Sequence, residues 1–130
     1  MKLIILSGAV PLAFAIAIVG AQPSQRPRVT GIYSDMRSSA QTGDADGFEI
    51  FVLRGVDKSF VLVQEAEGAP SYPVLVPAVL TDSTLTFDLR ETILRGLGEF
   101  SGRFQGNQLN GRFTGVARQL VLPRGRSFWQ

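Results

Sequence analysis

Two short stretches in the C-terminal half place an arginine directly before a phenylalanine. Arg103-Phe104 and Arg112-Phe113 each follow a glycine, so that Gly-Arg-Phe occurs twice within residues 99–113. Cations beside aromatic rings are found at sites that stack nucleic-acid bases or hold an anionic ligand. Such a site needs its rings and cations on one accessible face. The alternative is that the repeat reflects only the geometry of a bent hairpin, and the secondary structure must decide between the two.

The carboxylates of the middle region are a second group with chemical potential. Two of them could act as acid and base in sugar hydrolysis if they lay about 5 to 9 Å apart in a cleft. The chain has no histidine and no cysteine, so a serine or threonine nucleophile would depend on Lys58 as its base, which is a weak arrangement. We therefore predict no catalytic residue. The carboxylates that an enzyme would draw on are Glu65, Glu67, Asp82, Asp88, Glu91 and Glu99.

A third candidate is the run Asp44-Ala45-Asp46-Gly47, because Asp-x-Asp before glycine can supply calcium ligands around a tight turn. A full calcium loop needs a third early oxygen ligand and a later bidentate acid, and neither is at the required spacing. Aspartate and glycine are also common turn residues before a strand. Without histidine and cysteine, zinc and copper lack their usual ligands. The sequence therefore predicts a turn here, no metal site and no cofactor.

The first residues have the pattern of an export signal. Lys2 gives a short positive start, residues 3–19 are almost wholly apolar, and the small residues Gly20 and Ala21 precede a polar stretch. We predict cleavage after Ala21. The expected product is a periplasmic or secreted protein with no stable membrane insertion after cleavage.

An uncleaved membrane anchor is the alternative, because the apolar run nearly reaches the roughly 18 residues that span a bilayer. Gly8 and Pro11 interrupt the run, which favours a signal peptide. A lipoprotein anchor needs a cysteine, and the chain has none. The predicted organisation is a signal peptide at residues 1–21, an arm at 22–28 and one domain at 29–130.

The charge balance argues against nucleic acid as a partner. The chain has 13 lysines and arginines against 11 aspartates and glutamates, and removal of Lys2 with the signal leaves 12 against 11. A nucleic-acid-binding domain is usually clearly basic. Because cysteine is absent, no disulfide braces the exported domain, and its core and sheet hydrogen bonds must suffice.

Short runs of β-branched and aromatic residues recur along the chain between clusters of Gly, Asp, Asn, Ser and Pro. This spacing is typical of an antiparallel sheet that closes into a barrel or folds into a sandwich. We predict an all-β domain whose single antiparallel sheet of about eight strands forms a small closed or nearly closed barrel. The expected strands are 29–34, 48–54, 59–65, 74–80, 84–90, 99–105, 108–114 and 116–122, with a helical turn at 92–97 that closes one barrel end.

The doubled Gly-Arg-Phe lies in the best-defined predicted hairpin. If Gly106-Asn107 is a two-residue loop, which suits the twist of the flanking strands, Phe100 faces Phe113. Apolar and polar residues then sort onto opposite faces, and a slip of one residue would destroy the sorting. The apolar face, expected to point into the barrel and to contact any ligand there, contains Phe100, Gly102, Phe104, Leu109, Gly111 and Phe113.

The same register separates the glycines from the arginines. Gly102 faces Gly111, which predicts a barrel corner or room reserved for a facing side chain. Arg103 and Arg112 point to solvent, away from the phenylalanine rings, so a base-stacking platform is not expected.

Two other segments, 48–53 and 60–63, are apolar on both sides. They predict central strands, or strands covered by the arm or a loop.

The stretch Thr30-Gly31-Ile32-Tyr33-Ser34 is similar to the Gly-x-aromatic start of lipocalin-like (calycin) barrels. In that family the ring closes the barrel base beneath an arginine from the last strand. The resemblance implies Tyr33 as the ring and Arg118 or Arg124 as the arginine. The mature chain, including its ending at 122–130, also resembles small exported bacterial β-barrel proteins of uncharacterised function.

Two hypotheses of function follow, with a weak enzyme as a third. An eight-stranded barrel can be filled by its own side chains or can hold one small ligand, so the first is a non-catalytic exported module that binds a small apolar or amphipathic molecule inside. The second is a surface-acting envelope interaction protein or enzyme inhibitor that uses strand edges and the Phe128-Trp129 tail, which lies beside Arg124 and Arg126. Alternatively, Phe128 and Trp129 fold back and close a barrel end.

Overall fold

The computed structural model describes Ala17, Gly20 and residues 28–130. The predicted signal peptide with its cleavage site, and the arm apart from Arg28, lie outside the described residues. Within the part of the chain that is described, no helix is long and apolar enough to cross a membrane.

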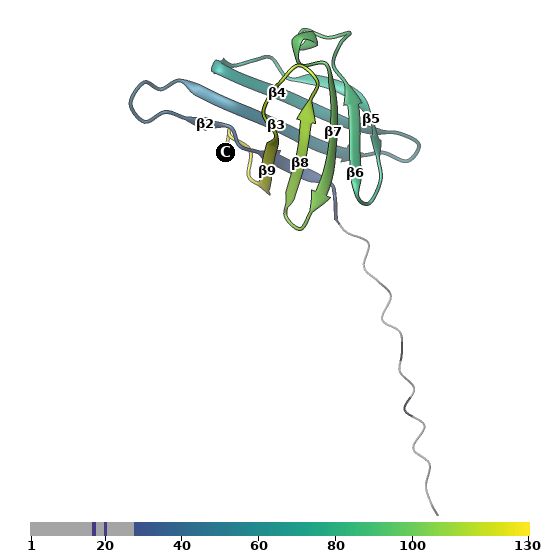
Figure 1. Cartoon of the computed structure of the whole chain (residues 1–130). Helices are drawn as coiled ribbons and strands as arrows, with labels where there is room; N and C mark the ends of the chain where they lie inside the picture. Colours follow the sequence, from purple (N-terminus) through teal and green to yellow (C-terminus); the bar gives the residue numbers. More distant parts are fainter. Residues whose placement is uncertain (1–16, 18–19, 21–27) are drawn as a thin grey trace, which may run out of the picture.

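The described domain is all-β, which confirms the predicted fold class (Figure 1). The elements are β1 (Gly31–Ser34), β2 (Arg37–Ser38), β3 (Ala45–Arg54), β4 (Ser59–Pro70), β5 (Val74–Leu80), β6 (Thr84–Asp88), the 3-10 helix η1 (Arg95–Leu97), β7 (Glu99–Gln105), β8 (Gln108–Phe113) and β9 (Leu120–Gly125).

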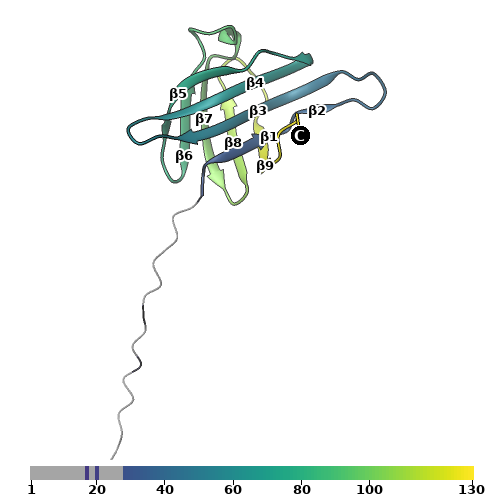
Figure 2. The same cartoon turned by 180° about the vertical axis from the view of Figure 1, so that it is seen from behind.

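The sheet closes on itself. From β3 to β9 each strand pairs antiparallel with the next, and β1 pairs with β9 on one side and with β3 on the other. Eight strands therefore form a closed antiparallel barrel, and the short β2 pairs with the start of β3 beyond the end of β1. Figures 1 and 2 show that β2, β3 and β4 reach beyond the rest of the wall and that the C-terminus lies beside β1 and β2.

Alternation along the strands places the apolar side chains in the interior, because residues two apart in a strand face the same side. Leu94 and Leu97, in and beside η1, join this core and close one end of the barrel, as predicted for the turn at 92–97. The core cluster contains Tyr33, Phe48, Ile50, Val52, Val61, Val63, Val76, Leu85, Phe87, Leu89, Leu94, Leu97, Phe100, Leu109, Phe113, Leu120 and Leu122.

The predicted register of β7 and β8 is confirmed, with Phe100 opposite Phe113 and Gly102 opposite Gly111. The last strand is a correction, because β9 covers Leu120–Gly125 and not residues 116–122. The chain after β8 is held at the barrel end by a hydrogen bond from Gly115 N to Leu97 O, at 2.9 Å. Pro123, which has no N–H to donate, is tolerated because it lies at the end of the β8–β9 ladder.

Candidate functional site

The six residues predicted to line a ligand site on the β7–β8 hairpin all lie on the inner side of the barrel wall. Four of them, Phe100, Gly102, Gly111 and Phe113, are buried together where the two strands pair. Leu109 is also buried, and Phe104 is half-buried near one end of the hairpin.

The space beside the paired glycines is occupied by this protein's own side chain. A Cβ added at Gly102 would come within 2.7 Å of the Phe100 ring, and one added at Gly111 would overlap the same ring and approach Ser101 O to 2.8 Å. Phe100 is 1% exposed. The glycines therefore leave room that the Phe100 ring fills.

Other rings pack around Phe100 and account for more of the interior. Phe87 stacks on it with centroids 4.9 Å apart, and Phe113 lies at 5.0 Å in a tilted arrangement. Phe48 in turn contacts Phe113 at 5.3 Å. Offset and tilted aromatic pairs of this kind stabilise the fold beyond the free energy of burial alone.

Tyr33 and Arg124, two of the residues implied by the family resemblance, lie together. They are paired across β1 and β9, and the buried Tyr33 hydroxyl donates to Val29 O at 2.9 Å. Arg124 donates to Arg28 O at 2.9 Å and to Thr30 O at 2.6 Å. Burial raises the pKa of Tyr33 above its ordinary value of 10.0, and nearby Arg124 offsets part of this rise. Arg124 is thus the arginine that accompanies the Tyr33 ring where β1 meets β9.

Arg118 has a different position from Arg124. Its guanidinium lies 5.4 Å from the Phe48 ring centroid and 3.5 Å from an Asp35 carboxylate oxygen. It therefore covers the barrel interior at Phe48 and does not contact Tyr33.

Trp129 was predicted either to form an interface or to close a barrel end, and the structure does not place it in a barrel end. Its side chain is 62% exposed on the outer surface, and its indole N–H donates to Gln64 Oε1 at 2.8 Å. Gln64 also donates from Nε2 to Ser71 O at 2.7 Å, so its amide connects the tail to the β4–β5 loop. This indole is therefore held in one orientation while most of its surface stays in solvent.

Residues 127–130, which we call the C-terminal tail, are directed to the outside of the barrel by Glu49 of β3. Ser127 Oγ donates to Glu49 Oε1 at 2.6 Å, and Phe128 N donates to Glu49 Oε2 at 2.7 Å. Phe128 also packs on a small cluster of buried residues separate from the main core, namely Met36, Ala45 and Ala66. Through these contacts the C-terminal tail lies on the outer surface, and Trp129 does not reach the barrel end.

The outer surface beneath the tail is apolar. Ile32, Phe51, Leu62 and Leu75 are paired in a row across β1, β3, β4 and β5. Leu75 is 60% exposed. We call this surface the tail face; it comprises Ile32, Glu49, Phe51, Leu62, Gln64 and Leu75.

A hollow of about 450 Å³ opens on the tail face beside Trp129. Ile32, Phe51 and Leu62 supply its apolar side chains, while Glu49 and Gln64 supply polar groups. Pro73, Ser127 and Trp129 complete the lining. We call it the tail-face hollow.

Sequence reasoning did not single out Glu49 or Gln64 as site residues. A signal was present, since Glu49 is one acidic residue inside a strand that is otherwise apolar on both sides. The expectation of a central strand, or of one covered by the arm or a loop, did not include the C-terminal tail, which contacts the outward Glu49.

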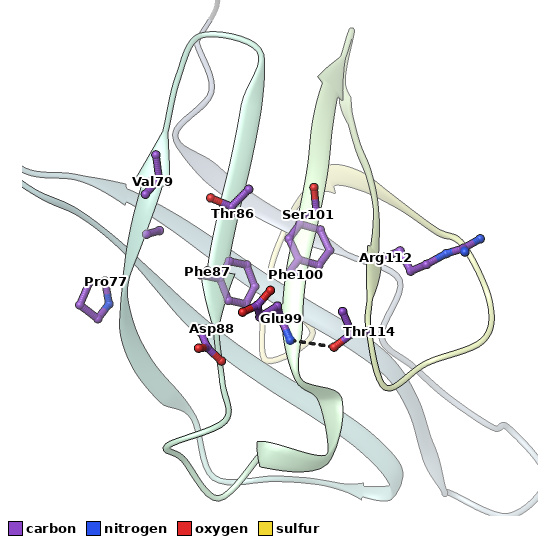
Figure 3. A pocket seen from close by; sticks show the side chains of 11 residues that line it. Pro77, Val79, Thr86, Phe87, Asp88, Glu99, Phe100, Ser101, Arg112 and Thr114 are labelled. Carbon is purple, nitrogen blue, oxygen red and sulfur yellow. Dashed lines mark hydrogen bonds between the residues drawn. The ribbon is translucent and has the colours of Figure 1, made fainter.

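A second hollow lies on the outer side of β5 to β8 (Figure 3). It is a groove of about 690 Å³ with Pro77 and Val79 on one wall and Arg112 on the other, and its two carboxylates, Asp88 and Glu99, face each other across β6 and β7. Both carboxylates lie 2.7 Å from the Arg90 guanidinium. The Arg90 side chain, through its hydrogen bonds, holds the pKa of Asp88 below its ordinary value.

The charged groups of this groove are exposed and the two carboxylates are paired, as on an ordinary solvated face. We call the outer side of β6, β7 and β8 the polar face. Arg103 and Arg112 lie there and are exposed, which confirms their predicted separation from the phenylalanine rings.

The other chemical candidates are dispersed. Asp82 forms an ion pair with Arg54 at 3.6 Å. The turn predicted at residues 44–47 lies earlier in the structure: Ser39 N donates to Asp44 O at 2.7 Å across a turn, and residues 45–47 already belong to β3. Among the described residues, no group of three or more His, Cys, Asp or Glu side chains is arranged to hold a metal ion.

The site that stands out is therefore the tail-face hollow, with a fixed but exposed indole, a nearly buried carboxylate and an apolar floor. Comparison of the chain with protein-family models, curated proteins and solved structures finds no match.

Proposed function

We propose that this chain is a non-catalytic binding module, exported by its N-terminal signal, that docks a protein partner of the cell envelope on its tail face. The observation that carries the proposal is the contrast between the two apolar regions. Inside, Phe100 fills the space that the paired glycines leave. Outside, Trp129 stands exposed beside a row of apolar side chains.

The tail face has the features of a protein interface. Exposed apolar residues in a contiguous patch mark interaction sites more often than isolated ones do, and tryptophan is among the residues that contribute most to binding free energy. The hydrogen bond from Trp129 to Gln64 fixes the indole before a partner arrives. Binding then loses less side-chain entropy than it would with a free tail.

The barrel that carries this face is proposed to be lipocalin-like and of bacterial origin. The pairing of Tyr33 on the first strand with Arg124 on the last supports this relationship. Binding of a small apolar molecule inside the barrel stays a prediction, and the position of the Phe100 ring gives it less support than the tail face has.

Site-specific photo-cross-linking in the native cell tests the proposal. A photo-reactive phenylalanine analogue is placed at Leu75 on the tail face, or at the likewise exposed Thr86 on the polar face as the matched control. We expect one discrete protein adduct from position 75, lost in the Trp129→Ala variant, and none from position 86. Equal adducts from both positions, or none from position 75, would contradict a docking role for the tail face.

Deletion of residues 127–130 separates a structural tail from a binding tail. The deletion removes two hydrogen bonds to Glu49, one to Gln64 and the packing of Phe128, so we expect a loss of roughly 2 to 4 kcal/mol in the free energy of unfolding. The barrel should stay folded by circular dichroism, and the adduct from position 75 should disappear. Native mass spectrometry of the gently purified chain tests the interior alternative, for which a co-purifying small molecule would be the support.

A further inference from the structure

Glu49 differs from every other charged side chain that the structure describes. It is 8% exposed, and no other charged residue of the described chain is buried. Its two oxygens each accept one hydrogen bond, from Ser127 Oγ and from Phe128 N. A carboxylate offers about four acceptor sites, so capacity for a further donor remains.

Among the described residues, no lysine or arginine forms an ion pair with this carboxylate. In the described part of the chain, ion pairs within 4.0 Å join Arg54 to Asp82, Arg90 to Asp88 and Glu99, and Arg118 to Asp35, and none involves Glu49. A carboxylate that is nearly removed from water without a counter-ion is costly, and buried charges in folded proteins are usually paired. Within the described part of the chain, the charge of Glu49 is thus met by two neutral donors and has no counter-ion.

The tail-face hollow also contains two other features that favour binding of a cationic side chain, an apolar surface and an indole ring. Ile32, Phe51 and Leu62 offer an apolar surface of the kind along which the aliphatic stem of a lysine or arginine packs. Trp129 offers an indole ring, which attracts a cation over its face. A purely apolar guest would leave Glu49 uncompensated, and an anionic guest would be repelled by it.

We propose that the tail-face hollow takes a lysine or arginine side chain from the partner protein, with its stem on the apolar floor and its cation against Glu49. The partner segment therefore presents a basic residue flanked by apolar residues, which rest on the row that ends at Leu75. This inference rests on the proposed function, because it specifies the chemistry of the partner that docks on the tail face.

The test uses three synthetic peptides and the mature chain. The peptides are acetyl-Leu-Val-Lys-Val-Leu-amide and its analogues with norleucine or glutamate in place of lysine. The chain has one tryptophan, so both the fluorescence and the indole N–H resonance of Trp129 report on the hollow without a label. We expect the lysine peptide to bind about tenfold more tightly than the norleucine peptide, as for a close ion pair with a partly desolvated partner, and the glutamate peptide to bind least.

Two variants test whether Glu49 causes the preference for the lysine peptide over the norleucine peptide. In Glu49→Gln the lysine and norleucine peptides should bind equally, while in Glu67→Gln, which removes an exposed carboxylate of β4 outside the hollow, the preference should survive. If Glu49→Gln releases the tail, the Trp129 indole resonance of the free protein will show it. The comparison among the three peptides on the unaltered chain then decides alone.

The outcomes separate this inference from the proposed function. Equal binding of the lysine and norleucine peptides at Trp129 would contradict the proposed contact between a cation and Glu49. It would leave the tail face as a docking surface. No response of Trp129 to any peptide would overturn the inference as stated, while cross-linking from position 75 still decides the proposed function independently. A preference for lysine that persists in Glu49→Gln would place the cation elsewhere and would also overturn it.

Discussion

The barrel interior and the tail face are both rich in apolar side chains, but they differ in what remains open. In the interior, one additional methyl group at Gly111 would overlap the Phe100 ring. On the tail face, a hollow of about 450 Å³ lies beside an indole that is 62% exposed. Composition makes the two regions look alike, whereas packing makes one a core and the other a surface able to bind.

The difference follows from which residues cover each region. The interior is enclosed by strands on all sides and by Leu94 and Leu97 at one end. Of the residues that the structure describes, a short tail partly covers the tail face, held by hydrogen bonds to Glu49 and Gln64. Strand alternation determines which side chains point inward, but it does not determine whether the outward ones are covered.

The largest expected effect comes from emptying the interior. Phe100→Ala should cost about 3 to 5 kcal/mol in the free energy of unfolding, because it removes a buried ring and leaves a cavity next to two glycines. The matched change on the tail face, Leu75→Ala, should change it by less than about 0.5 kcal/mol, since that side chain is mostly exposed. Urea denaturation followed by circular dichroism measures both. Similar costs at the two positions would break the contrast between core and surface.

A smaller effect is expected from overfilling the same space. Gly111→Ala should cost about 1 to 3 kcal/mol, because the new methyl group meets the Phe100 ring and the Ser101 carbonyl. Gly125→Ala is the control, since a Cβ there has no atom within 4 Å. Phe100→Leu should relieve part of the clash, so the double variant with Gly111→Ala should cost less than the sum of the two single changes. Strict additivity, measured by the same denaturation curves, would show that the ring is not the obstacle.

The sequence predicted the barrel and the β7–β8 register because both depend on local periodicity. Phe100 to Phe113 alternates without exception around a two-residue loop, so only one pairing sorts the faces. The choice between Arg118 and Arg124 beside Tyr33 could not be made, since it requires the start of β9, which is at Leu120 and not at residue 116.

The position of Trp129 could not be predicted from local sequence patterns either, because it depends on contacts with residues far away in the sequence. The C-terminal tail has no periodicity of its own, and its place is decided by hydrogen bonds from Ser127 and Phe128 to Glu49, a residue nearly eighty positions earlier. The side chain that fills the space beside Gly102 and Gly111 could not be predicted from the sequence either. Gly102 and Gly111 indicate that room is needed there, but which side chain fills it depends on the direction in which the Phe100 ring points.

The smallest expected effect lies at the border of the interior, where Glu65 follows Val61 and Val63 on the inner side of β4. Burial, and secondarily the nearby charge of Glu67, raise the pKa of Glu65 above its ordinary value of 4.5. A raised pKa in the folded state means that the stabilising contribution is complete below pH 4.5 and is lost as the pH rises through the folded value. Because Glu65 is only half-buried and solvent screens its charge, Glu65→Gln should raise the free energy of unfolding at pH 7 by only roughly a few tenths of a kcal/mol. That gain should vanish at pH 3.5 in paired urea titrations. A variant no more stable than the parent chain at pH 7 would mean that the inner side of β4 is already solvated at this position, and a gain that persists in acid would mean that ionisation of Glu65 does not cause it.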